Sequence, residues 1–351
     1  MKKLTLLILL GLLPFLKGKT QEQITDFLYG LTAGTLNDTE QLIEGYMNPV
    51  GAWFGNGLNA GWYNTGKPHQ FPGFDVTVGF HIITPPADAL YFSPTLESFM
   101  IDGDGELATI LGPSDPTQVM YTNPINEQNE NLFKIPGGLN WDGALLMPYL
   151  QGSIGLIKKT EILFRYAPSV SLKELETGFW GIGLKHDVKQ WIPGVKILPF
   201  DLSVLMGYSK LNSGFNFSRD DQNLNFDVKA FNSNLILSKK LSIFTPYVGI
   251  GYQYSQATLA LNGTYTIYDW NEALGVVEEG MNLEVTDPFN FSFGGVNGFK
   301  ATMGARIKLL LFTIHVDWTK AEYDMFTIGI GLNSDIGSKL IGGTIDKTIS
   351  E

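Results

Sequence analysis

His315 and Asp317 stand two positions apart near the C-terminal end of the chain, and they have the chemistry of an acid–base pair. Side chains two positions apart in a strand share a face, so the imidazole and the carboxylate could act together. The other histidines, His69, His81 and His186, lie far away in the sequence, and no G-x-S-x-G or H-E-x-x-H motif accompanies them. The pattern therefore favours hydrogen-bonded wall residues, and we expect no enzyme.

Three segments imitate ligand-binding loops. Residues 61–68 nearly match a phosphate loop, but Pro68 replaces the Ser or Thr that binds magnesium. Residues 55–60 imitate a dinucleotide fingerprint without the buried strand and helix that should flank it. Residues 102–106 alternate carboxylates as calcium loops do, but the later glycine and the terminal glutamate are absent, which favours an Asp-Gly turn. We expect no metal and no cofactor.

The composition narrows the class of protein. The 351 residues carry a net charge of −11, which disfavours nucleic-acid partners because an acidic surface repels phosphate. The absence of cysteine excludes disulfides, thiol nucleophiles, cysteine-bound zinc and a lipoprotein anchor. The 40 glycines and 13% aromatic residues fit twisted strands better than helices.

The first 18 residues have the layout of a secretory signal peptide. Lys2 and Lys3 precede an apolar run over residues 4–16, and Gly18 is a small residue suited to a cleavage site. The alternative is a membrane anchor, but this run is shorter than the ~20 residues of a spanning helix. No later apolar run approaches that length, so the exported chain is soluble or crosses a membrane as strands.

Alternation of apolar with polar or small residues dominates the chain from Phe74 onward and predicts strands. Ten such segments are clear, among them residues 74–82, 144–156, 162–166, 180–187, 200–208, 248–255, 299–308, 312–319 and 326–332. A soluble sandwich and an outer-membrane barrel both produce this pattern. Strands of about ten residues, small residues on the polar faces, and Trp and Tyr near strand ends favour the barrel.

Short connections alternate with long ones along the chain, as periplasmic turns alternate with external loops. Both ends of the barrel then lie in the periplasm, which requires an even number of strands. We count residues 57–64 as an eleventh strand, so the proline-rich residues 85–140 must add one or three. The predicted fold is all-β, a transmembrane antiparallel β-barrel of 12–14 strands.

The N-terminal region preceding the barrel differs in kind. Asn37 and Glu40 form a capping box before a short helix at residues 39–44, and residues 23–31 suit another. This region is either a plug entering from the periplasmic side or a loosely ordered leader. The predicted organisation is a signal peptide (1–18), a helical leader or plug (19–55), a barrel (56–333) with a proline-rich loop or inserted segment (85–140), and a tail (334–351).

Strand parity places a set of charged and titratable side chains inside the barrel. The predicted lumen residues are Glu161, Arg165, Lys185, Asp201, Lys300, Arg306, Lys308, His315 and Asp317. We favour a salt-bridged ladder that fills a narrow interior. The alternative is a polar constriction that guides a solute or anchors a plug.

Residues 46–51, 57–65 and 185–191 resemble an uncharacterised family of Gram-negative outer-membrane barrel proteins. The helical leader before a barrel is more distantly similar to the long-chain fatty-acid transporter family, a likeness that implies hydrophobic cargo. The chain departs from many outer-membrane barrels because its last strand ends near Leu332 and Asn333, before a tail, rather than on a terminal aromatic residue.

The sequence thus predicts a protein exported through the periplasm to the bacterial outer membrane. Its expected function is porin-like passive transport of small or hydrophobic solutes. The alternative is a structural or interaction barrel with a side-chain-filled lumen that acts through its external loops. The expected partners are outer-membrane lipid, the barrel-assembly machinery and a hydrophobic small-molecule cargo.

Overall fold

The computed structural model describes residues 35–122, 128–141, 143–172, 175–216, 222–271 and 276–334. The predicted signal peptide, the helix predicted at residues 23–31 and residues 335–351 of the predicted tail lie outside the described residues. No helix in the described part of the chain is long and apolar enough to cross a membrane.

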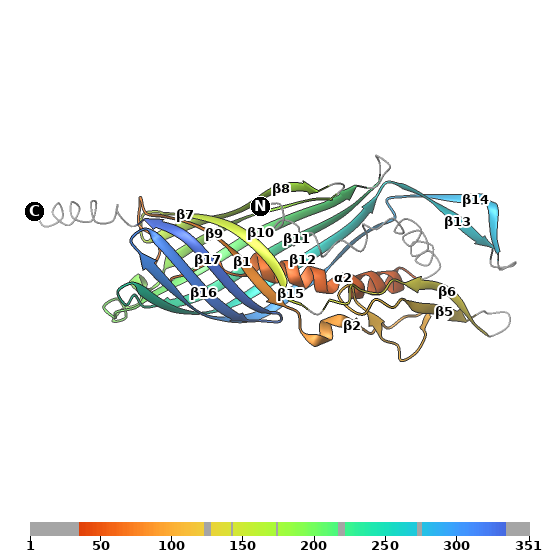
Figure 1. The fold of residues 1–351 in the computed structure, drawn as a ribbon, viewed down its shortest axis with the longest axis horizontal. Helices are drawn as coiled ribbons and strands as arrows, with labels where there is room; N and C mark the ends of the chain where they lie inside the picture. Colours follow the sequence, from red (N-terminus) through yellow and green to blue (C-terminus); the bar gives the residue numbers. More distant parts are fainter. Residues whose placement is uncertain are drawn as a thin grey trace, which may run out of the picture.

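Ten antiparallel strands close into a barrel, which confirms the predicted fold class (Figure 1). Their order around the barrel is β1-β17-β16-β15-β12-β11-β10-β9-β8-β7. β1 closes the circle because it pairs with both β17 and β7. The bounds are β1 Phe74–Thr84, β7 Leu145–Gly155, β8 Thr160–Leu172, β9 Leu175–Asp187, β10 Asp201–Asn216, β11 Asn223–Ser238, β12 Phe244–Asn262, β15 Phe289–Leu309, β16 Phe312–Lys320 and β17 Asp324–Ser334.

The predicted count of 12–14 strands is wrong, and the barrel consists of ten. Residues 57–59 end a helix instead of starting a strand. Residues 85–140 add no strand to the barrel in their described part. They form a short helix and small sheets at one end of it: η3 Ala87–Leu90, β2 Tyr91–Phe92, β3 Met100–Ile101, β4 Leu107–Ala108, β5 Thr117–Thr122 and β6 Asn129–Ile135.

The barrel wall is apolar outside, and its inward faces carry most of its buried polar side chains. On β16, Ile314 and Val316 are exposed, whereas His315 and Asp317 are buried in the lumen. Strict alternation gives both faces their character because successive side chains of a strand point to opposite sides. An exposed apolar belt around a polar interior is the arrangement of a barrel that faces lipid.

The two ends of the barrel differ in their connections. One end, here called the short-turn end, carries residues 156–159, 188–200, 239–243 and 310–311. The other, the long-loop end, carries residues 85–144 and the hairpin of β13 (Thr264–Asn271) and β14 (Val276–Thr286), which extends far from the barrel in Figure 1.

Helix α2 (Leu36–Asn59) lies inside the barrel and is much longer than the predicted helix at residues 39–44. Its N-cap is Thr35 rather than Asn37: the Thr35 side chain accepts a hydrogen bond from the backbone N–H of Asp38 at 3.1 Å. The tertiary environment extends the helix, because a sequence with Pro49 and several glycines has low intrinsic helix propensity.

The helix begins at the long-loop end, whereas one of the two interpretations of this region was a plug entering from the periplasmic side, where the predicted orientation places the short turns. At its start, Gln41 exchanges two hydrogen bonds of 2.9 Å with the backbone of Thr95, which belongs to the long-loop end. Residues 60–73 then continue through the lumen to the short-turn end, where β1 begins. The N-terminal segment therefore runs along the interior of the barrel before the wall starts.

Candidate functional site: the filled lumen

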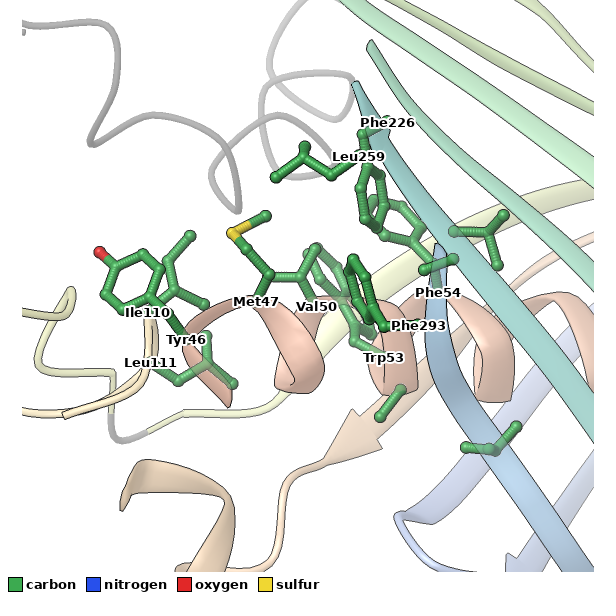
Figure 2. Close-up of a cluster of buried hydrophobic side chains, with 14 of the residues drawn as sticks. Tyr46, Met47, Val50, Trp53, Phe54, Ile110, Leu111, Phe226, Leu259 and Phe293 are labelled. Atoms are coloured by element: carbon green, nitrogen blue, oxygen red, sulfur yellow. The ribbon is translucent and has the colours of Figure 1, made fainter. Parts of the chain in front are cut away.

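The half of the lumen next to the long-loop end is filled by apolar contacts between α2 and the wall. The helix packs chiefly on β15, β12 and β11. Figure 2 shows side chains of α2 beside wall residues, and the Phe54 and Phe226 ring centroids lie 5.8 Å apart. The residues of this contact are Val50, Trp53 and Phe54 of the helix with Phe226, Leu259 and Phe293 of the wall. Their burial holds the helix in the barrel through the hydrophobic effect.

The long-loop end covers the start of the helix. Ile110 and Leu111 lie beside Tyr46 and Met47 in Figure 2, and the backbone N–H of Ile110 donates to the Tyr46 carbonyl at 3.0 Å. All four side chains are buried. The start of the helix and the described part of residues 85–140 therefore share one hydrophobic core at this end.

Glycines on α2 allow the helix to approach the wall closely. A Cβ at Gly55 would lie 2.1 Å from Ser255 Oγ, and one at Gly57 would lie 2.3 Å from Met147 Sδ. Both distances are far below van der Waals contact, so a larger residue would push the helix away from the strands. These helical glycines are explained by packing and not by nucleotide binding.

Two wall cations bind the C-terminal end of α2, whose last turn contains no basic residue. Lys300 Nζ donates to the Asn59 carbonyl at 2.6 Å, and Arg165 Nη1 donates to the Leu58 carbonyl at 3.3 Å. Both side chains are buried. The last carbonyls of a helix lack intrahelical partners and carry its negative dipole end, so cations from the barrel satisfy both needs.

Trp62 fills the middle of the lumen, just beyond the helix. The Arg165 guanidinium lies 4.3 Å from the centre of its ring, within cation–π distance. On the other strands, a Cβ at Gly183 would lie 2.7 Å from the Trp62 ring, and Cβ atoms at Gly181 and Gly207 would lie 3.2 and 3.1 Å from it. This part of the wall is shaped to fit the indole, and a bulkier wall would exclude it.

Polar groups occupy the lumen near the short-turn end. Glu161 and Lys185 form an ion pair of 2.8 Å, in which both side chains are 3% exposed. The carboxylate also accepts a hydrogen bond from the backbone N–H of His69 at 2.9 Å. Asn333 donates to Asp75 at 2.9 Å between β17 and β1, and Asn333 also lies 3.0 Å from the His69 ring. The N-terminal segment is thus tied to the wall at this end as well.

His315 and Asp317 do not form the acid–base pair that their spacing allowed. The His315 Nε2 atom lies 3.2 Å from the Tyr149 hydroxyl, and the Tyr247 hydroxyl donates to Asp317 at 3.0 Å. Each is held by a different tyrosine from another strand. This arrangement ties the two side chains to different strands of the wall.

The structure places the nine predicted lumen residues in two groups. Asp201 and Lys308 are half-buried at the short-turn end, and Lys308 bonds to Asn333. The residues buried within the lumen are Glu161, Arg165, Lys185, Lys300, Arg306, His315 and Asp317. These residues do not form the predicted ladder of ion pairs throughout. Arg165 and Lys300 bind helix carbonyls, and Arg306 donates to the Asn64 side chain at 3.1 Å.

Sequence reasoning missed Trp62 and Asn59 because it assigned their segment to a strand. The signal was present on the wall: β9 and β10 carry glycine at lumen-facing positions 181, 183 and 207. Three glycines side by side leave an empty space on the inner face of a narrow barrel, and a large side chain from another segment must fill it. Tyr149 lies in the strand predicted at residues 144–156, but its pairing with His315 was not predicted.

Comparison with known proteins gives a family match and distant structural likenesses. A family model described as "Family of unknown function (DUF6588)" matches residues 1–334. No curated protein matches the chain.

Among solved structures, the translocator domain of the autotransporter NalP from Neisseria meningitidis is 9% identical, with a TM-score of 0.30, 76% of this chain covered and 90% of that chain. The attachment invasion locus protein Ail of Yersinia pestis is 7% identical, with a TM-score of 0.23 and coverages of 75% and 98%. The outer membrane transporter YddB from Escherichia coli is 12% identical, with a TM-score of 0.31 and coverages of 75% and 44%.

Proposed function

The chain belongs to the family of unknown function DUF6588, and we propose that it is a closed outer-membrane barrel that acts through the assembly at its long-loop end. The predicted resemblance to an uncharacterised family is confirmed, and the distant likeness to the long-chain fatty-acid transporter family stays a prediction. One observation carries the proposal: the N-terminal segment occupies the lumen from end to end and is bonded to the wall along its length.

The size of the barrel supports a closed lumen. Barrels of eight strands have interiors that side chains fill, whereas porins with open aqueous channels have 16–18. Here ten strands enclose a helix, the Trp62 indole and the buried Glu161–Lys185 pair. We infer that these groups take up the space that a wide channel would need.

We propose that the protein acts through the surface of the long-loop end, which includes residues 85–144. Its described residues between 85 and 144 include seven acidic residues and one lysine, Lys134. Such a surface attracts basic partners and repels nucleic acid and other polyanions. The location that we propose is the bacterial outer membrane, reached by export through the periplasm, with the short turns in the periplasm.

A conductance measurement tests the closed lumen. The refolded mature chain is inserted in a planar bilayer, with insertion checked by heat-modifiable electrophoretic mobility. We expect no steady current steps from the inserted protein. Deletion of residues 35–59 should create steps, because it removes α2 from the lumen. Ohmic steps from the intact chain would overturn the proposal.

Cysteine labelling tests the orientation, since the natural chain has no cysteine. Asp104→Cys places a thiol at an exposed position of the long-loop end, and Lys240→Cys places one at the short-turn end. A membrane-impermeant maleimide should label the first variant on intact cells and the second only after the outer membrane is opened. The reverse pattern would contradict the proposed orientation.

Passage of small or hydrophobic solutes is a second candidate, and buried polar atoms in the lumen favour it. His81 Nε2, His315 Nδ1 and Thr313 Oγ1 have no hydrogen-bond partner among the described residues. Buried groups of this kind are usually satisfied by water, so a hydrated path beside the helix would explain them. Liposomes containing the intact protein should swell in small sugars or take up hydrophobic probes if this path conducts.

We propose no catalytic role, and therefore no cofactor, because the groups best suited to acid–base chemistry are bonded to tyrosines in the wall. Purified protein should show no esterase or protease activity. An activity that His315→Ala abolishes would overturn this part of the proposal.

A further inference from the structure

The connections at the short-turn end are positively charged, in contrast to the acidic chain as a whole. Residues 156–159, 188–200, 239–243 and 310–311 contain six lysines and no aspartate or glutamate. The whole chain has the opposite balance, with 35 acidic and 24 basic residues. These four connections are therefore positively charged, although the protein as a whole is acidic.

Two of these lysines are engaged by the protein itself. Lys159 forms an ion pair of 3.2 Å with Asp187, and Lys189 donates to the Phe200 carbonyl at 2.6 Å. The other four are exposed and form what we call the basic rim. The basic rim consists of Lys158, Lys196, Lys239 and Lys240.

Large apolar side chains stand beside these lysines. Ile157 is 77% exposed and Ile197 is 86% exposed, each next to a lysine in the sequence. Trp191, in the same turn as Lys196, is also exposed. Apolar tips next to lysines suit a membrane interface, where the apolar parts enter the lipid and the ammonium groups reach the head groups.

The basic rim covers a continuous arc. Its turns join β7 to β8, β9 to β10 and β11 to β12, and these six strands are neighbours in the barrel. The turn between β15 and β16 has apolar residues and no charge, with Leu310 91% exposed. One side of the short-turn end is therefore both basic and apolar, while the remaining turn is only apolar.

We propose that the basic rim binds the phosphate head groups of anionic phospholipids in the leaflet at the short-turn end. The assignment rests on charge complementarity, since an anionic membrane surface attracts nearby lysines. The proposal rests on the proposed membrane location. It goes beyond that location because it names the class of lipid that the protein binds.

Lipid selectivity is the measurement that tests the basic rim. The intact mature chain is reconstituted in phosphatidylcholine vesicles with spin-labelled phosphatidylglycerol or phosphatidylcholine, and the motionally restricted lipid is quantified. We expect a preference of about threefold or more for phosphatidylglycerol, lost in high salt. Changing all four rim lysines to Gln should bring the ratio close to one.

Two lysines at the long-loop half provide a matched control. Lys134 and Lys229 are also exposed, and changing both to Gln should leave the selectivity unchanged. Equal association of both lipids with the natural protein would overturn the proposal, as would selectivity that survives in the rim variant or falls in the control.

Two further measurements distinguish phospholipid from lipid A binding, and failure of the basic rim from failure of the membrane location. Vesicles containing lipid A, the phosphorylated lipid of the opposite leaflet, should show weaker dependence on the basic rim than phosphatidylglycerol does; a stronger dependence would overturn the assignment to phospholipid. Restricted lipid of any kind reports that the barrel is inserted. Its complete absence would refute the membrane location, whereas restricted lipid without selectivity would refute the basic rim alone.

Discussion

Lys300 Nζ donates a hydrogen bond to the main-chain carbonyl of Asn59, the last residue of α2, at 2.6 Å. The lysine comes from a wall strand, and the carbonyl comes from the segment that fills the barrel. This contact therefore links the position of the helix to the chemistry of the wall. It also explains a buried lysine without assigning it to a solute path.

Replacing this lysine should loosen the helix. We expect Lys300→Met to lower the free energy of unfolding by about 1.5–3 kcal/mol, because a buried carbonyl loses a charged donor. Guanidinium unfolding in lipid vesicles, followed by tryptophan fluorescence, measures the change. Lys229→Met is the matched control, since Lys229 is exposed. Equal effects of the two substitutions would show that the contact to Asn59 adds nothing specific.

The fit between Trp62 and its glycine wall can be tested by a single methyl group. A Cβ at Gly183 would lie 2.7 Å from the Trp62 ring, whereas a Cβ at Gly298 meets nothing within 4 Å. We expect Gly183→Ala to cost about 1–3 kcal/mol through overpacking. Gly298→Ala should change the stability by less than about 0.5 kcal/mol. If both variants unfold alike, the indole is not held by the wall.

The wall could be predicted from the sequence, because alternation reports which face of a strand a residue occupies. The parity of β16 alone placed His315 and Asp317 inside the barrel, and the structure has them there. The segment inside the barrel was not predictable in the same way. A helix buried on all sides has no amphipathic stripe, so residues 46–60 lack the periodicity by which surface helices are recognised.

The strand count failed for a related reason. Gly57 and the residues after it contain aromatic and small side chains, which suit a strand as well as a packed lumen segment. Pairing partners are also invisible in a single sequence: Tyr149 and His315 are 166 residues apart, and only the closed barrel brings them within 3.2 Å.

Acid should loosen the start of α2. Burial of the Asp38 carboxyl would raise its pKa, but hydrogen bonds from Glu97, Ser98 and Thr35 outweigh it and hold the pKa below the ordinary value of an aspartate. A lowered folded-state pKa means that the carboxylate stabilises the fold above the unfolded pKa and that this contribution is lost as the pH falls through the folded value. Amide exchange at residues 36–42, corrected for the intrinsic rate, should therefore accelerate below about pH 4.

Asp38→Asn provides the control for that pH dependence. It should raise the exchange at neutral pH and remove most of the acid effect, because the titrating group is absent. An acid effect of the same size in this variant would assign it to other groups.

The buried pair of Glu161 and Lys185 should show a large coupling. Each single change, Glu161→Gln or Lys185→Met, leaves its partner uncompensated in the lumen and should cost about 3–5 kcal/mol. The double variant should recover much of that loss, because no unpaired charge remains. A double-mutant cycle measured by guanidinium unfolding gives the coupling free energy. If the two losses simply add, water enters the short-turn end and screens the pair, and the lumen is more hydrated there than a filled barrel requires.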